Sequence, residues 1–437
     1  MEFDRTLTGT PRRGLIGATI GFFAGFAAMA VFGPVAHVFA KAMRLSPIEI
    51  GWLVSAPALS GSLLRIPFAA WADRVGARKP FLILLGLSLA AMVGLLAALE
   101  VLYPDRLGHG FYPWLFGLGV MSGCGIATFS VGASQVSYWH SAEQHGAALA
   151  TYAGFGNMAP GLFSLFIPLA LARGGLTEVY VDWLGFLTIG IAVYAATGRD
   201  AWYFQLTARG EAHDSARNHA RSLGQEIFPA SEFGGSIGRA AHEWQTWALI
   251  GLYFINFGGF LALTAWMPTY WRASFGASLA AAGALTAFFS LLASAVRVAA
   301  GPFSDRIGGG RLVSIALTIL LCGSAIMMRA GGYATAIAGT TIVAIAIGIA
   351  NAGIFKMVPQ LVPHAVGGAA GLVGGLGALG GFVLPPMMAF AAMRSERGYA
   401  GAFAVFVVLA IGGLAIAAAL HRTTSRAGLP IAQRRAA

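Results

Sequence analysis

Long apolar runs are the feature of this 437-residue chain that most restricts how it can fold. A run of about 20 apolar residues is long enough to cross a bilayer as a helix. With 57% hydrophobic and only 10% charged residues, the chain is not an ordinary soluble enzyme, a disordered protein or a disulfide-stapled secreted module. We expect an all-α membrane protein with twelve transmembrane helices. The predicted spans are residues 14–38, 49–72, 78–101, 111–137, 146–171, 179–197, 245–271, 278–303, 310–330, 333–357, 365–393 and 398–421.

The distribution of Lys and Arg predicts how these spans are oriented. Segments on the side of the N-terminus hold seventeen basic residues, whereas loops on the other side hold eight. Because cytoplasmic segments carry the excess of basic residues, both termini are expected in the cytoplasm. The chain is then a multi-pass protein of the bacterial inner membrane. The net charge of +11 has the same origin, so we expect the lipid bilayer as a partner, no nucleic acid, and a monomer.

An internal repeat divides the chain into two halves. Residues 65–79 read RIPFAAWADRVGARK and residues 297–311 read RVAAGPFSDRIGGGR, at a constant offset of 232. Six spans precede and six follow one long hydrophilic stretch, which is typical of the major facilitator fold. We expect helical bundles at 1–197 and 245–437, the latter with a short cytoplasmic tail. Residues 198–244 are expected to form a cytoplasmic loop, for which a solvated linker is favoured over a regulatory or docking role.

Arg65 and Arg297 occupy equivalent positions in the two repeats. Each lies eight residues before the Asp of its loop, about 12 Å along a helix and so near the middle of the membrane. A charge at that depth costs at least about 2.5–3.5 kcal/mol. None of the seventeen acidic residues lies in the interior of a predicted span, so we expect the counter-charge to be an anionic substrate. Arginine offers forked donors that match flat oxyanions such as nitrate, nitrite or a carboxylate. The alternative is a pair of structural arginines that donate to backbone carbonyls.

Four other side chains are predicted at the same depth. Asn157 and Tyr253 could donate hydrogen bonds to an anion, and Phe129 and Phe257 could enclose a flat one. Depth alone does not separate these roles from ordinary packing, which is the more frequent role of a buried ring.

Glycine is concentrated in one predicted span of each half, 146–171 and 365–393. Small residues at four-residue spacing let helices approach closely. Such helices could slide and bend during alternating access, or could only pack tightly. From these runs Gly156, Gly375 and Gly377 are assigned to the substrate site.

The repeated Asp-Arg pairs lie in loops on the expected cytoplasmic side. Asp73 with Arg74, and Asp305 with Arg306, are predicted to latch that face in one conformation. This role is conformational and does not involve the substrate.

Several stretches resemble one known family. SGSLLRIP, ATYAGFGNMAPG, NAGIFKMVPQLVP and GLVGGLGALGGFVLPP are similar to segments of the nitrate/nitrite porter family of the major facilitator superfamily, and the resemblance covers nearly the whole chain. It implies that Arg65 and Arg297 bind nitrate or nitrite, together with Asn157, Tyr253 and the faces of the two phenylalanines. In one departure, Ala159-Pro160 stands where the family's first signature continues with glycine. Pro160 lacks a backbone donor and is expected to kink the span.

These observations predict a secondary active transporter of nitrate and nitrite that acts in nitrate assimilation. No nucleophile–base pair, metal-ligand set or cofactor motif is present, so neither an enzyme, a cofactor nor a metal is expected. Nitrate import in exchange for nitrite is slightly favoured over nitrate/proton symport, because exchange needs no proton carrier. A small carboxylate carrier and a nitrate sensor are further alternatives.

Overall fold

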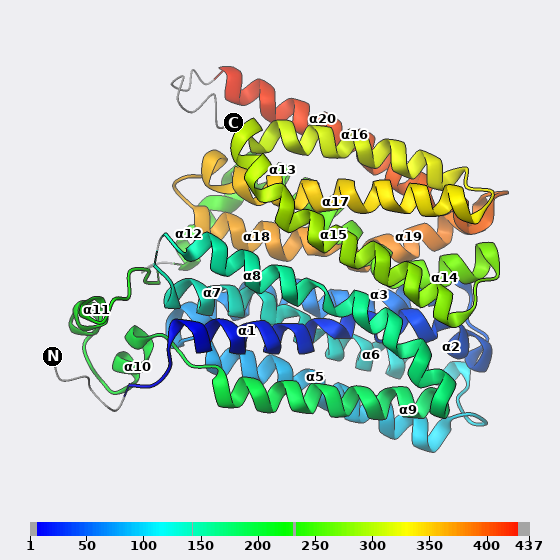
Figure 1. Cartoon of the computed structure of the whole chain (residues 1–437), viewed down its shortest axis with the longest axis horizontal. Coiled ribbons are helices and arrows are strands. Elements are labelled where there is room, and N and C mark those ends of the chain that lie inside the picture. The colour runs from blue at the N-terminus through cyan, green and yellow to red at the C-terminus, as the bar shows by residue number, and fades with distance from the viewer. Residues whose placement is uncertain (1–6, 142, 230–232, 427–437) are drawn as a thin grey trace.

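The computed structural model describes residues 7–141, 143–229 and 233–426, apart from the side chains of 233, 234, 302, 304, 305 and 424–426. All regular secondary structure in these ranges is helical. Eleven helical segments in the described chain are long and apolar enough to cross a membrane. Figure 1 shows them aligned along one direction. The expected all-α membrane fold is therefore confirmed.

The N-terminal helices lie in the lower part of Figure 1, in blue to green. They are α1 (Pro11–Phe26), α2 (Ala36–Met43), α3 (Pro47–Leu63), α4 (Arg65–Val75), α5 (Arg78–Leu102), α6 (Tyr112–Ser122), α7 (Thr128–Trp139), α8 (His145–Asn157) and α9 (Ala159–Thr197).

One apolar segment, His145–Thr197, covers two predicted spans. Its 53 residues are too many for one crossing of a core about 30 Å thick. Gly175 interrupts α9 with φ of 79°, a conformation that glycine adopts without steric cost. Figure 1 shows the chain reversing direction within α9. Eleven apolar segments are thus compatible with twelve crossings.

The C-terminal helices lie in the upper part of Figure 1. They are α13 (Trp244–Tyr253), α14 (Gly259–Phe275), α15 (Leu279–Ile307), α16 (Gly309–Met328), α17 (Tyr333–Leu361), α18 (Val366–Ala378), α19 (Gly380–Arg394) and α20 (Ala404–Arg426). The two sets of helices meet where α3 packs against α19 and α9 packs against α15. We call this boundary the seam.

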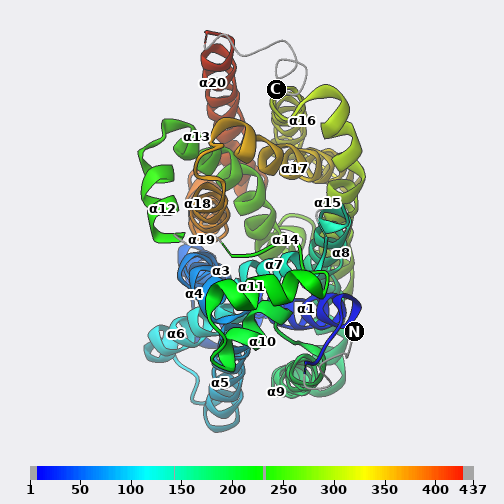
Figure 2. The same ribbon diagram turned by 90° about the vertical axis from the view of Figure 1, so that its left-hand side faces the viewer.

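The central segment is more ordered than a solvated linker. It forms α10 (Trp202–Ala208), α11 (His213–Ser222) and α12 (Phe233–His242), which Figure 2 shows across one end of the bundle. The apolar side chains of α10 and α11 form a small core with Tyr138 and Trp139 of α7, and α12 packs against α18. Burial of these aromatic residues explains the docking. We call this end of the bundle the central-loop side.

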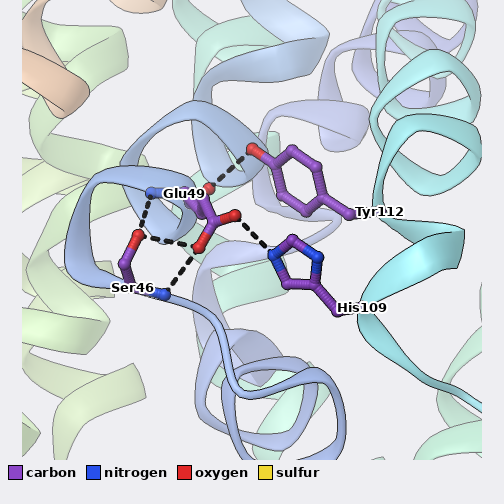
Figure 3. A network of polar contacts seen from close by, with 4 residues as sticks. All are labelled: Ser46, Glu49, His109 and Tyr112. Carbon is purple, nitrogen blue, oxygen red and sulfur yellow. Dashed lines mark hydrogen bonds and ion pairs between the residues drawn. The ribbon is translucent and has the colours of Figure 1, made fainter.

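A polar network holds the start of α3 at the other end, which we call the opposite side (Figure 3). The backbone N–H and the hydroxyl of Ser46 donate to Glu49, whose own backbone N–H donates to the Ser46 hydroxyl in a capping box. The second carboxylate oxygen of Glu49 lies 2.6 Å from His109 Nε2, and the Tyr112 hydroxyl donates to the Glu49 carbonyl. The network therefore joins α3 to the start of α6.

Candidate substrate site

The helices that carry most of the predicted site residues are interrupted beside those residues. The α3–α4 break at Leu64 precedes Arg65, and the α8–α9 break at Met158 follows Asn157. A π-helical turn, Phe254–Gly258, contains Phe257 and follows Tyr253. A 3₁₀ segment precedes α7, and the α18–α19 break at Leu379 follows Gly377. Such breaks often mark functional sites, and discontinuous helices are typical of transporter binding sites.

Arg65 is one of the largest fully buried side chains, with 1% of its surface exposed. Its Nε donates to the Gly61 carbonyl at 2.9 Å, and Nη1 donates to the Gly374 carbonyl of α18 at 3.3 Å. Its Nη2 is buried and has no hydrogen-bond partner among the described residues. Backbone carbonyls therefore occupy only two of the five N–H groups of Arg65, and both N–H groups of Nη2 remain for a ligand.

Phe257 brings the two arginines together. The Cζ atom of Arg65 lies 5.1 Å from the centroid of the Phe257 ring, and that of Arg297 lies 5.6 Å from the same centroid. On its other side, Arg65 lies 4.9 Å from the ring centroid of Phe129. Arg297 is half-buried in α15, and its Nη1 is buried without a described partner. Helices from both sides of the seam thus contribute to one cationic site.

Tyr253 and Asn157 are buried beside this pair. The Tyr253 ring stacks on Phe257 at 4.9 Å, and its hydroxyl interacts electrostatically with both guanidinium groups. Asn157 ends α8 with 2% of its surface exposed. Its backbone carbonyl accepts a hydrogen bond from Ser294, which lies one turn before Arg297 on α15. All six predicted polar and aromatic residues therefore lie at the seam or on the breaks beside it.

Four buried polar atoms at this site have no direct hydrogen-bond partner among the described residues. The buried atoms without a described partner are Arg65 Nη2, Arg297 Nη1, Tyr253 Oη and Asn157 Oδ1. The first three can all donate to an anion. Neither arginine forms a salt bridge with a described acidic side chain. The Tyr253 hydroxyl lies close enough to both guanidinium groups for weak hydrogen bonding, but no described acidic side chain pairs with them, so the arrangement can accept a small anion.

The predicted glycines pack against neighbouring helices. A Cβ on Gly156 would lie 2.0 Å from the Phe22 ring, and one on Gly375 would lie 2.7 Å from Ile66 across the seam. A Cβ on Gly377 would lie 2.7 Å from the Tyr253 ring. Gly377 thus leaves room for the ring of the site residue Tyr253, whereas Gly156 and Gly375 allow neighbouring helices to pack closely.

Sequence reasoning missed the backbone acceptors and one supporting ring. The Gly61 and Gly374 carbonyls hold Arg65. The Tyr152 ring stacks on Phe129 at 6.0 Å, and its hydroxyl donates to the Phe129 carbonyl. Gly374 lies beside the predicted Gly375, but every residue has a backbone carbonyl, so the residue type does not show which carbonyl binds Arg65.

The predicted latch residues lie at the central-loop side. Asp73 accepts a hydrogen bond of 2.6 Å from the Tyr138 hydroxyl on α7. Arg74 and Arg306 are exposed. The side chain of Asp305 lies outside the described residues. The latch stays a prediction.

Asp200 contacts the loop after α4, which the sequence did not indicate. Its carboxylate accepts the backbone N–H of Arg78 at 2.8 Å and lies against Gly76, where a Cβ would be 2.5 Å away. Burial raises the pKa of Asp200, and the backbone N–H groups of Arg78 and Ala77 oppose that shift. The end of the first bundle is thereby tied to the loop after α4.

Comparison with known proteins identifies the family. A family model described as Major Facilitator Superfamily matches residues 18–385 and 249–436. The chain belongs to this superfamily. The xylose transporter XylE from E. coli, in a partially occluded inward-open conformation, shares its fold with a TM-score of 0.72 at 14% identity, covering 94% of this chain and 97% of that one. An inward-facing bacterial homologue of the lysosomal transporter Spinster has a TM-score of 0.64 at 18% identity, with coverages of 95% and 97%.

Curated relatives within the superfamily confirm the resemblance to nitrate/nitrite porters. The "Probable nitrate/nitrite antiporter NarK1" of Thermus thermophilus is 28% identical over 91% of this chain and 89% of its own length. The "Probable nitrate/nitrite transporter NarK2" of Mycobacterium tuberculosis is 29% identical over 83% and 85%. The "Nitrite extrusion protein" of Bacillus subtilis is 25% identical over 91% of both.

Proposed function

We propose that this superfamily member carries nitrate and nitrite across the membrane, with Arg65 and Arg297 holding the anion. The observation that supports the proposal most directly is the pair of guanidinium groups beside Phe257. Each has a buried nitrogen whose contact among the described residues is at most a weak one with the Tyr253 hydroxyl. The names of relatives that align with most of the chain point to the same substrates.

The site favours a small, flat anion. Guanidinium groups are planar and donate in a fixed fork, so they match trigonal oxyanions in one plane. The rings of Phe129 and Phe257 supply apolar faces within about 5 Å of Arg65. The Tyr253 hydroxyl adds a third donor. We infer that nitrate accepts hydrogen bonds from both arginines and Tyr253 while its faces contact the aromatic rings.

Alternating access is the mechanism that best fits the packing at the seam. On the opposite side a Cβ on Gly51 of α3 would lie 2.8 Å from Pro386 of α19, and one on Gly33 would lie 2.7 Å from the Ala265 carbonyl of α14. Because these glycines have no side chain, the helices of the two halves pack tightly on the opposite side and close the path from that side to the site. The helix breaks at the level of the arginines supply hinges about which that contact could open.

Exchange of external nitrate for internal nitrite is the coupling that we propose. The two anions carry equal charge, so exchange needs no net charge movement and no proton carrier. Among the described residues no acidic side chain pairs with either arginine at the seam. The cationic site would then be occupied by an anion in each half of the cycle, which avoids the cost of moving two bare charges.

Nitrate entry into liposomes that contain the purified protein tests this proposal. One batch is loaded with nitrite, and another holds an inert anion under an inward proton gradient. The Arg65→Gln/Arg297→Gln double variant serves as the control, and excess formate or acetate tests competition.

We expect uptake only into the nitrite-loaded vesicles, without competition from either carboxylate. Uptake driven by the proton gradient alone would replace exchange with symport. Strong competition by formate or acetate would indicate a carboxylate carrier. Bound nitrate without uptake in either batch would contradict transport and favour a sensor.

We also propose that both termini face the cytoplasm of a bacterial cell and that 1–197 and 245–437 move as separate bundles. The excess of basic residues on the central-loop side supports this orientation. Reporter fusions at the two termini and at the loop before α6 test it. Equal reporter activity at all three sites would contradict the proposed orientation.

A further inference from the structure

Three arginines converge on the opposite side, away from the substrate site. Arg329, Arg394 and Arg397 line one open pocket of about 510 Å³ together with Ser395. Arg329 follows α16, Arg394 is the last residue of α19, and Arg397 precedes the 3₁₀ turn that leads into α20. Three separate segments therefore bring positive charge to one place.

One acidic residue, Glu396, lies between Arg394 and Arg397 in the chain, so the cluster holds three positive charges and one negative charge. All three arginines are exposed, and none forms a salt bridge with a described acidic side chain. A cation at the C-terminal end of a helix interacts favourably with the helix dipole. That effect accounts for Arg329 and Arg394 individually, but not for Arg397 or for the shared pocket. Like charges repel, so their convergence indicates an external anion.

Apolar side chains beside the pocket place it at the membrane boundary. Phe390 and Met393 of α19 are 51% and 56% exposed, which is typical of a lipid-facing surface in a chain of this class. The Arg394 Cζ atom lies 4.9 Å from the Phe390 ring centroid. Its guanidinium is thus held along the lipid-facing surface, at the end of the helix where phospholipid headgroups lie.

We propose that this pocket binds the phosphate of an anionic phospholipid, whose acyl chains lie along Phe390 and Met393. Arginine forks donate to phosphate oxygens in a bidentate manner. Basic pockets between transmembrane helices bind anionic headgroups on the cytoplasmic side of membranes, and we infer the same chemistry for this pocket at the other end of the bundle. The pocket adjoins this lipid-facing surface, so lipid phosphates are the anions nearest to it. One bound headgroup would tie the ends of α16 and α19 to the start of the last span.

Native mass spectrometry of the detergent-purified full chain tests the site. Phosphatidylglycerol, phosphatidylcholine or inorganic phosphate is titrated against the wild type, the single Gln variants and the triple variant R329Q/R394Q/R397Q. The matched control is K41Q/R44Q/R106Q, which removes the same charge from exposed positions at the end of α2 and in the turn after α5, on the same side of the N-terminal half. Circular dichroism and thermal unfolding verify that each variant is folded.

We expect phosphatidylglycerol to bind the wild type and the control more tightly than phosphatidylcholine does. Each single variant should weaken that binding roughly fivefold, and the triple variant about a hundredfold. Equal phosphatidylglycerol binding by the pocket variant and the wild type would overturn the proposal, as would an equal loss in the control. Inorganic phosphate that displaces the lipid at comparable concentration would show a free-anion site and overturn the assignment to lipid. The readout contains no nitrate, so it does not depend on the proposed transport.

Discussion

A buried arginine needs acceptors for several N–H groups, and Arg65 shows how this chain supplies them. Two backbone carbonyls, from Gly61 and Gly374, take one N–H each. The Nη2 group is left without a described acceptor. The arginine is thus oriented by the protein and still has a donor for the substrate. Lysine has a compact charge and no fork, so it cannot do both.

We therefore predict that Arg65→Lys and Arg297→Lys each lower nitrate uptake roughly 10–100-fold, because a lost hydrogen bond between charged partners costs about 1.5–3 kcal/mol. The thermal stability of the purified protein should change little, because the positive charge remains. Initial rates in nitrite-loaded vesicles and thermal unfolding in detergent give the two quantities.

Arg173→Lys is the matched control. Arg173 of α9 is exposed and forms a salt bridge with Asp182, so its side chain is not part of the buried site. Near-normal nitrate uptake by Arg65→Lys or Arg297→Lys would contradict the proposal that both guanidinium groups bind the anion.

At the scale of elements, the interrupted helices explain why the site residues meet. A continuous α-helix satisfies its own carbonyls, whereas a break leaves backbone groups and small residues available to a neighbour. The Gly374 carbonyl reaches Arg65 near such a break. Gly377, close to the same break, lets Tyr253 pack against α18 without a side chain between them.

We predict that Gly377→Ala lowers both thermal stability and nitrate uptake. The new Cβ would lie 2.7 Å from the Tyr253 ring, and overpacking of this kind costs about 1–3 kcal/mol. The greater helix propensity of alanine returns at most about 1 kcal/mol. The net effect is a displaced Tyr253 and a loss of stability, measured by thermal unfolding and by uptake.

Gly367→Ala on the same helix is the control, because a Cβ there meets nothing within 4 Å. It should be neutral or slightly stabilising. If both variants behave alike, close packing behind Tyr253 does not govern the site.

At the scale of the whole molecule, the seam is the surface that must open and close. Near the end of α8 that carries Asn157, a Cβ on Gly154 would lie 3.0 Å from the Val298 side chain of α15. These helices belong to different halves of the repeat. Paired cysteines at the two positions come near the Cβ separation of a disulfide, about 3.5–4.5 Å.

We predict that Gly154→Cys/Val298→Cys, with the exposed Cys322 replaced by Ser, loses uptake on oxidation and regains it with reductant. The cross-link would hold α8 to α15 and prevent relative motion of the halves. Each single cysteine variant should be insensitive to the oxidant. Normal uptake by a fully cross-linked protein would contradict alternating access across this seam.

Much of this architecture was predictable because it rests on local chemistry. Apolar run length determines which segments span a membrane, and the repeat starting at Arg65 and Arg297 places two charges at one depth. The central segment was less predictable, since its docking depends on contacts of Tyr203 and Phe204 with Tyr138 of a distant helix. Most residues of the central segment are polar or glycine, so the few aromatic residues that dock it do not stand out in the sequence.

Span length and the cost of a charge inside the membrane are properties of short segments, so the class of protein, its membrane spans and the two arginines at one depth follow from the sequence. The tertiary structure alone decided which groups complete the site. The carbonyl of Gly374, 309 positions from Arg65, and the shared face of Phe257 come together only through packing across the seam. Backbone acceptors and ring faces carry no residue-type signature, so their roles follow from proximity.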